Sequence, residues 1–193
     1  MFLFAVTVVE LGLLFYLTST FWIEDWIYLA GHLVVLVIAL TRPVPERQDI
    51  SFTSSIAVFV AYAYPYAQVA YLRWKPGTAL WPEAGLVLII FGACLSFGSL
   101  LCLGRGFGVW PAFRGLAASG PYRLVRHPMY LAYVVSDIGY NFCEYDFVTV
   151  LLVIVGWAAL LYRIRAEERV LSRNAGWLSY AARVRYRLMP GIW

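Results

Sequence analysis

Residues 33–40 read LVVLVIAL, an unbroken apolar run with none of the polar positions that an amphipathic element needs. A second run, LVLII at residues 86–90, has the same character. Strands of a membrane barrel alternate apolar and polar residues, because one face meets lipid and the other faces the lumen. Neither run alternates, so we predict that both belong to apolar helices.

The composition of the whole chain extends this reading. Of its 193 residues 62% are hydrophobic and only 13% are charged, and the mean hydropathy is +0.73. A soluble domain carries about 25% charged and about 45–50% apolar residues, so this chain has too few polar groups to cover a water-soluble globule. The composition predicts an integral membrane protein and excludes a disordered chain, a coiled coil and a disulfide-stapled secreted module.

Six apolar stretches approach the roughly 20 residues that a helical span requires. Their ranges are 2–20, 26–41, 50–72, 84–103, 129–142 and 147–162. A cleaved signal peptide is the alternative for the first stretch, but no basic residues precede it and no A-x-A site follows it. We therefore predict a single-domain, all-α, polytopic membrane helix bundle with five to six transmembrane helices.

The basic residues predict the orientation of the chain, since they gather on the cytoplasmic side of membrane proteins. With a cytoplasmic N-terminus, the opposite side keeps only Arg73 and Lys75 of the 15 basic residues. A re-entrant fifth stretch would move the arginine-rich tail to that side. We therefore predict a tight hairpin of two spans joined at residues 143–146, and cytoplasmic N- and C-termini.

Residues 104–128 form a long polar segment that is rich in glycine and interrupted by three prolines. Irregular backbone at membrane depth is tolerated where it lines a cavity. A simple interfacial loop is the alternative, and we expect Arg105 and Arg114 to face lipid phosphates as they would in such a loop. It explains His127 less well, because Pro128 follows it and opens a span, so that the ring and nearby carbonyls point toward the loop.

Residues 163–193 form the second polar segment and continue the last span as a helix. Arg163 and Glu167 are four residues apart and Arg165 and Glu168 are three apart, a spacing that often just solvates a helix face. The arginines lie so near hydrocarbon, however, that they should be paired or face a cavity. Side chains of adjacent residues point about 100° apart, so one acid can pair with an arginine while the other faces a ligand.

Ionisable residues inside spans are functional candidates. Asp137 is a stronger candidate than Glu10, because it lies in the span that His127 opens. The cysteines form no CxxC pair, and we predict no metal site. The alternating arginines of the tail are expected to form a basic patch on an anionic leaflet; they are Arg183, Arg185 and Arg187.

Two motifs carry a family resemblance. Residues 120–130 read GPYRLVRHPMY, residues 163–171 read RIRAEERVL, and a Tyr-x3-Val-x5-Pro pattern begins at Tyr180. From about Leu103 onward the chain resembles the isoprenylcysteine carboxyl methyltransferase and phospholipid methyltransferase superfamily of integral membrane enzymes. It departs from the family in the tail, where Trp177 stands in place of the first of two tyrosines.

The resemblance implies methyl transfer from S-adenosylmethionine to a lipophilic, membrane-embedded acceptor. Residues 1–103 would supply N-terminal spans, and residues 104–193 the cofactor-binding and catalytic part. The cofactor would lie at the cytoplasmic face between the RHPxY segment and the C-terminal helix, and the acceptor would enter between helices from the bilayer. The implied cofactor-binding residues are Tyr122, Arg126, His127, Pro128, Tyr130, Glu167 and Glu168.

Methyl transfer is an in-line displacement in which positioning and desolvation can supply most of the rate. For a carboxylate acceptor we predict Arg163 as the catalytic residue that orients it, with Glu168 fixing that arginine or the cofactor. These two residues are about 140° apart on an ideal helix, so a direct pair is not expected. For an amine acceptor, Glu167 or Glu168 could act as the base.

The expected partners are a lipophilic small molecule or lipid as substrate and the membrane lipids, with no nucleic acid. The alternatives are a phospholipid-amine N-methyltransferase, an NADPH-dependent membrane reductase of similar fold and a non-catalytic membrane scaffold. The sequence leaves open the acceptor, the atom that is methylated and the oligomeric state.

Overall fold

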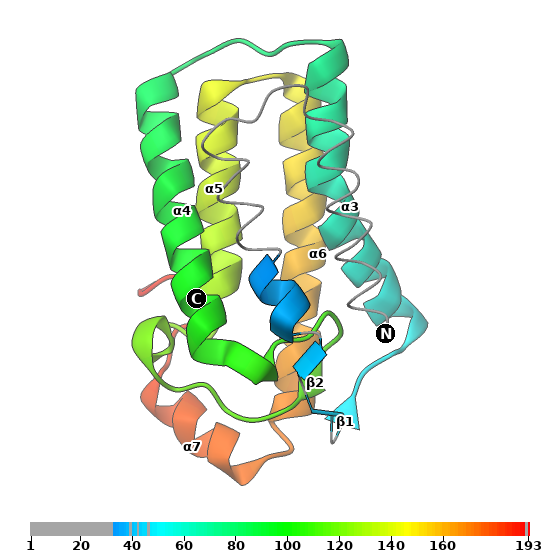
Figure 1. Ribbon diagram of the computed structural model, residues 1–193, viewed down its shortest axis with the longest axis vertical. Helices are drawn as coiled ribbons and strands as arrows, with labels where there is room; N and C mark the ends of the chain where they lie inside the picture. The colour runs from blue at the N-terminus through cyan, green and yellow to red at the C-terminus, as the bar shows by residue number, and fades with distance from the viewer. Residues whose placement is uncertain (1–32, 39, 42, 46, 192) are drawn as a thin grey trace.

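The computed structural model describes residues 33–38, 40–41, 43–45, 47–191 and 193. Four long helices within these residues run up and down beside one another, and the short helix α7 lies across one end (Figure 1). Their bounds are α3 Phe52–Trp74, α4 Pro82–Leu103, α5 Pro128–Cys143, α6 Phe147–Leu171 and α7 Ala175–Arg183. Residues 33–38 and 40–41 are also helical.

Three helices in the described part of the chain are long and apolar enough to cross a membrane: Phe52–Trp74, Pro82–Gly106 and Phe147–Leu171. The predicted all-α membrane helix bundle is therefore confirmed. With 16 residues, α5 is about 24 Å long, shorter than the roughly 30 Å of a hydrocarbon core. Because residues 2–20 and much of 26–41 lie outside the described residues, the predicted number of spans and their orientation stay predictions.

Helix α6 follows α5 after a connection of three residues, 144–146, where the sequence predicted a tight turn (Figure 1). That α5 is a full span stays a prediction. The turn is short because Asp146 caps α6: its side chain accepts the Val148 N–H at 2.8 Å, while the Thr149 hydroxyl accepts the Asp146 N–H at 3.3 Å. Both contacts satisfy backbone donors that a helix start leaves without partners.

The four helices form two closely packed pairs. Small residues bring α4 against α5: a Cβ atom on Gly85 would lie 2.7 Å from the Gly139 carbonyl oxygen. In the other pair, a Cβ atom on Gly156 of α6 would lie 2.5 Å from the Tyr64 ring of α3. Such close approach is how helices associate in lipid, where apolar burial gives little drive. In contrast, α5 and α6 make few contacts with each other.

The chain between α4 and α5 forms an irregular wall below the bundle. It contains the short helices η1 (Gly104–Gly106) and η2 (Gly120–Arg123) and the strand β2 (Ala112–Phe113), which pairs antiparallel with β1 (Arg47–Gln48). The Asp49 N–H also donates to the Pro111 carbonyl at 2.9 Å. These bonds fix the wall beneath the start of α3, at the end of the bundle that we call the pocket end.

Candidate functional site

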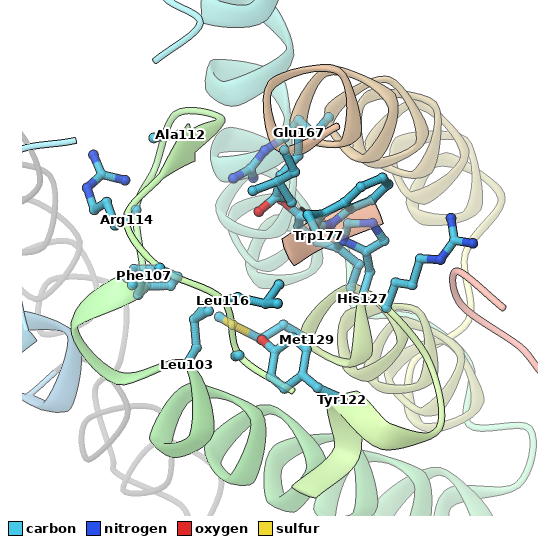
Figure 2. A pocket seen from close by; sticks show the side chains of 18 of the residues that line it. Leu103, Phe107, Ala112, Arg114, Leu116, Tyr122, His127, Met129, Glu167 and Trp177 are labelled. Carbon is cyan, nitrogen blue, oxygen red and sulfur yellow. Dashed lines mark hydrogen bonds and ion pairs between the residues drawn. The ribbon is translucent and has the colours of Figure 1, made fainter. Parts of the chain in front are cut away.

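A pocket opens at the pocket end, between the irregular wall, the start of α5, the end of α6 and α7 (Figure 2). It encloses about 830 Å³ of space, its open mouth included. Arg114 and Ala112 lie on one side of it, and His127 and Trp177 on the other (Figure 2). Six predicted site residues line it: Tyr122, Arg126, His127, Tyr130, Arg163 and Glu167.

Pro128 and Glu168, the other two predicted site residues, lie outside this lining. Pro128 occupies the first turn of α5, where its fixed φ suits a helix start and its missing N–H would have had no helical partner,. It is fully buried. Its effect is local: it begins α5 directly after His127 and so fixes where that ring leaves the backbone.

Glu168 joins three parts of the chain. Its Oε1 accepts from Arg126 Nη1 at 3.1 Å, its Oε2 accepts from Arg187 Nε at 2.8 Å, and His127 Nε2 lies 3.4 Å from Oε1. The residue is 8% exposed. A buried carboxylate with these partners is compensated, and it holds α6 to the loop before α5 and to the tail.

The tail after α7 folds back onto the same loop. The N–H groups of Arg126 and His127 donate to the carbonyls of Tyr186 and Arg187, both at 2.9 Å. Arg126 Nε also donates to the Val184 carbonyl at 2.7 Å. The expectation that Arg187 belongs to a lipid-facing basic patch is therefore corrected, since this backbone pairing turns its side chain toward Glu168.

Aromatic residues of α7 complete the pocket. Trp177, which replaces a tyrosine of the family pattern, is buried, and its ring centroid lies 5.6 Å from the Arg126 guanidinium. The Tyr180 hydroxyl donates to the Tyr122 carbonyl at 2.8 Å. Burial raises the pKa of Tyr180 to about 12, although the nearby Arg126 opposes the shift, so this hydroxyl remains a donor at neutral pH.

Glu167 has a different position from its neighbour. It lines the pocket and accepts the Tyr130 hydroxyl at 3.0 Å, and its Oε2 lies 3.8 Å from His127 Nδ1. The two acids thus divide as the helical geometry predicted: Glu168 pairs with arginines and Glu167 faces the cavity. Of the helical pairs considered from the sequence, neither Arg163–Glu167 nor Arg165–Glu168 is among the salt bridges of the described residues.

Arg163 is buried at the pocket with 6% exposure. Its Nη2 donates to the Val109 carbonyl at 2.9 Å, and its guanidinium lies 5.4 Å from the ring centroids of both Tyr62 and Tyr130. Its Nε has no hydrogen-bond partner within the described part of the chain. The arrangement is a desolvated cation held in place by two aromatic rings, with one buried donor left unsatisfied,.

Tyr62 and Arg114 are among the lining residues that were not identified as site residues from the sequence. Tyr62 comes from α3, far from either motif. Arg114, expected to face lipid phosphates, lines the pocket instead and packs its guanidinium directly against Gly108. The glycine is the one available signal, because a residue without Cβ often marks a close approach.

Residues 85–173 match the sequence model of the isoprenylcysteine carboxyl methyltransferase (ICMT) family. Among curated proteins, Protein-S-isoprenylcysteine O-methyltransferase A of Arabidopsis thaliana is 31% identical over 108 residues. That alignment covers 52% of this chain and 55% of the relative, so it spans about half of each. The resemblance predicted from the two motifs is thereby confirmed.

Proposed function

We propose, from the similarity of residues 85–173 to the ICMT family, that this protein transfers a methyl group from S-adenosylmethionine to the carboxylate of a lipophilic acceptor in the membrane. The observation that carries the proposal is the state of Arg163, a buried guanidinium at the pocket with no carboxylate within ion-pair distance in the described residues.

A buried cation with no carboxylate in direct ion-pair contact is unfavourable, and pairing it with a ligand anion offsets part of the penalty. An acceptor carboxylate at the pocket provides that anion through a charge-assisted hydrogen bond to the Arg163 guanidinium,. An amine acceptor would need a base, yet Glu168 is compensated by two arginines and Glu167 is assigned to the cofactor in this proposal. The charge pattern therefore favours a carboxylate acceptor over an amine.

The lining of the pocket suits the proposed cofactor. Tyr130 and Trp177 offer aromatic faces, which attract a positively charged sulfonium, and Glu167 offers a carboxylate oxygen for a hydroxyl or ammonium group. When bound, S-adenosylmethionine supplies an electrophilic methyl group. We assign Tyr122, Tyr130, Glu167 and Trp177 to cofactor contact, and Arg126, His127, Pro128 and Glu168 to the support of that wall.

A second cavity, the α5–α6 groove, supports a lipophilic acceptor. It lies where α5 and α6 make few contacts and encloses about 440 Å³, its open side included. It shares Tyr130 with the pocket, and its other lining residues are apolar: Val134, Trp157, Leu160, Leu161 and Leu188. An apolar chain in this groove can place its acidic end beside Tyr130, at the pocket that contains Arg163.

In this proposal the residues orient and desolvate the reactants. Arg163 holds the acceptor carboxylate, which is ionised at neutral pH and needs no base, while Tyr62 and Tyr130 fix the guanidinium between them. One carboxylate oxygen forms the new bond to the methyl carbon as the sulfur–methyl bond breaks. The products are a methyl ester and S-adenosylhomocysteine.

The test is carried out on purified protein in lipid nanodiscs. We expect S-adenosylhomocysteine to bind, and an S-prenylated thiol acid to acquire a labelled methyl group that alkali releases as methanol. An alkali-stable labelled product formed from a phospholipid amine, offered as a second acceptor in the same assay, would indicate N-methylation instead. Binding of NADPH without S-adenosylhomocysteine would favour the reductase, and binding of neither would favour the scaffold.

A further inference from the structure

Asp137 is a buried acid of α5 that the proposed reaction does not use. It is 9% exposed and lines neither the pocket nor the α5–α6 groove. Its Oδ2 accepts from the Tyr64 hydroxyl at 2.8 Å and from Trp157 Nε1 at 2.7 Å. One carboxylate oxygen of α5 therefore holds an aromatic side chain of α3 and another of α6.

The support behind this acid is rigid. Tyr64 is 6% exposed, and its ring lies against Gly156, the residue next to Trp157, so closely that a Cβ atom there would meet the ring. The Tyr64 hydroxyl is thus fixed by packing as well as by its hydrogen bond. With its N–H bonded to Asp137, the Trp157 indole turns its polar edge toward the bundle.

The remainder of that indole faces the α5–α6 groove, because Trp157 is one of the lining residues. Helix α5 leads away from the pocket end and α6 returns to it (Figure 1). Along α6, Leu161 and Leu160 come before Trp157 as the groove runs away from the pocket. Trp157 is six residues from Arg163, about 9 Å along the helix axis, and is the α6 lining residue farthest from the pocket.

We infer that Trp157 forms the end wall of the α5–α6 groove and limits the length of the apolar chain that the groove accepts, and that Asp137 is a positioning residue for its indole. The inference rests on the proposed function, since the occupant is the chain of an acid whose carboxylate lies at Arg163. A chain that extends past Trp157 must leave the groove for the bilayer and loses its contacts there.

The test compares S-geranyl, S-farnesyl and S-geranylgeranyl thiopropionate as acceptors for wild-type protein and Trp157→Ala. We expect the variant to raise the ratio of kcat/KM for the longest chain to that for the shortest about tenfold, the effect of burying about two more methylene groups. Trp157→Phe keeps an aromatic wall and should stay near the wild-type ratio.

The role of Asp137 is tested with the same ratio. Asp137→Asn keeps an oxygen that both donors can use and should preserve the chain-length preference, whereas Asp137→Leu frees the indole and should shift the ratio toward that of Trp157→Ala. Trp74→Ala, at the exposed far end of α3, is the matched control and should change nothing. A loss of activity with an unchanged ratio would indicate a merely structural role.

An unchanged ratio in an active Trp157→Ala protein overturns the inference and leaves the proposed function standing. If the wild-type protein methylates none of the acids, the proposed function fails separately, and equilibrium dialysis of the same acids still tests the groove. If Trp157→Ala strengthens binding of the longest acid relative to the shortest, the result supports Trp157 as the end wall of the groove. An identical affinity order in both proteins, or binding of no acid, contradicts it.

Discussion

The two ends of the helix bundle are built in different ways. At the end opposite the pocket, the short connections 75–81 and 144–146 pair backbone to backbone, with the Thr78 N–H donating to the Tyr145 carbonyl at 2.8 Å and the reverse bond at 2.9 Å. The pocket end instead has a long irregular loop and buried charges, among them Arg163 and Glu168.

This difference determines at which end of the bundle a substitution should have the larger effect. Backbone pairing closes the far end with no buried charge among the residues described there, and its salt bridge, Lys75–Asp146, is exposed on the lysine side. Buried ion pairs contribute little net stability, but they become strongly destabilising when one partner is removed. We therefore expect substitutions at the pocket end to have large effects and substitutions at the far end to have small ones.

The largest effect is expected from Glu168→Ala, because it leaves two arginines and the start of α5 without the carboxylate that joins them. The free energy of unfolding should fall by about 3–5 kcal/mol. The variant should also lose S-adenosylhomocysteine binding. Thermal unfolding and equilibrium binding measure both. Glu144→Ala, which removes an exposed acid from the far end, is the matched control; equal behaviour of the two variants would contradict the comparison.

Arg163→Ala should lower turnover about a hundredfold, as loss of one preorganised charge-assisted donor does. S-adenosylhomocysteine binding should remain, since the assigned cofactor contacts lie on Tyr122, Tyr130, Glu167 and Trp177. Arg163→Lys keeps the charge but not the planar fork, and should recover only part of the rate. Two quantities are measured, kcat and the dissociation constant of S-adenosylhomocysteine. An unchanged kcat would reject the proposed role.

His127→Ala should weaken S-adenosylhomocysteine binding about tenfold, the loss of roughly one hydrogen bond to a charged group. The ring lies between both acids and stacks on Tyr130 at 5.7 Å between centroids, so its removal loosens Glu167. Titration calorimetry in nanodiscs measures the change. Wild-type affinity in this variant would contradict the role of His127 in supporting the cofactor wall.

The smallest effect is expected from Lys75→Ala. Hydrogen bonds from Lys75 and from the Val148 N–H keep the pKa of Asp146 below its ordinary value of 3.8. The stabilisation this gives is present above that value and is lost as the pH falls through the lowered pKa. Because the lysine is exposed, melting at pH 7 should hardly change. A large drop in melting temperature would overturn the contrast between the ends.

The helices could be predicted from the sequence, because apolar runs set their bounds. The predicted stretches 50–72 and 84–103 became Phe52–Trp74 and Pro82–Leu103, and their starts moved to where a serine cap or a proline decides the first turn. The hairpin at 143–146 was also predicted. The resemblance to the ICMT family rested on local motifs, which need no tertiary information.

The site was predicted only in part. Adjacent positions on a helix require Glu167 and Glu168 to diverge, but which of them meets the arginines depends on where the tail returns. That return is a backbone pairing between residues 126–127 and 186–187, and nothing local encodes it. For the same reason Tyr62 and Arg114 were missed, since their direction is set by distant packing.

The α5–α6 groove has a kinetic consequence under the proposed function. An acceptor that enters laterally from the lipid has an effective concentration expressed per membrane area rather than per volume of water. The rate at which acceptor reaches the enzyme then falls when inert lipid dilutes the acceptor within the same leaflet. Dilution of the aqueous phase with buffer leaves that rate unchanged. Encounter with the enzyme becomes diffusion in two dimensions, governed by the fluidity and composition of the surrounding bilayer.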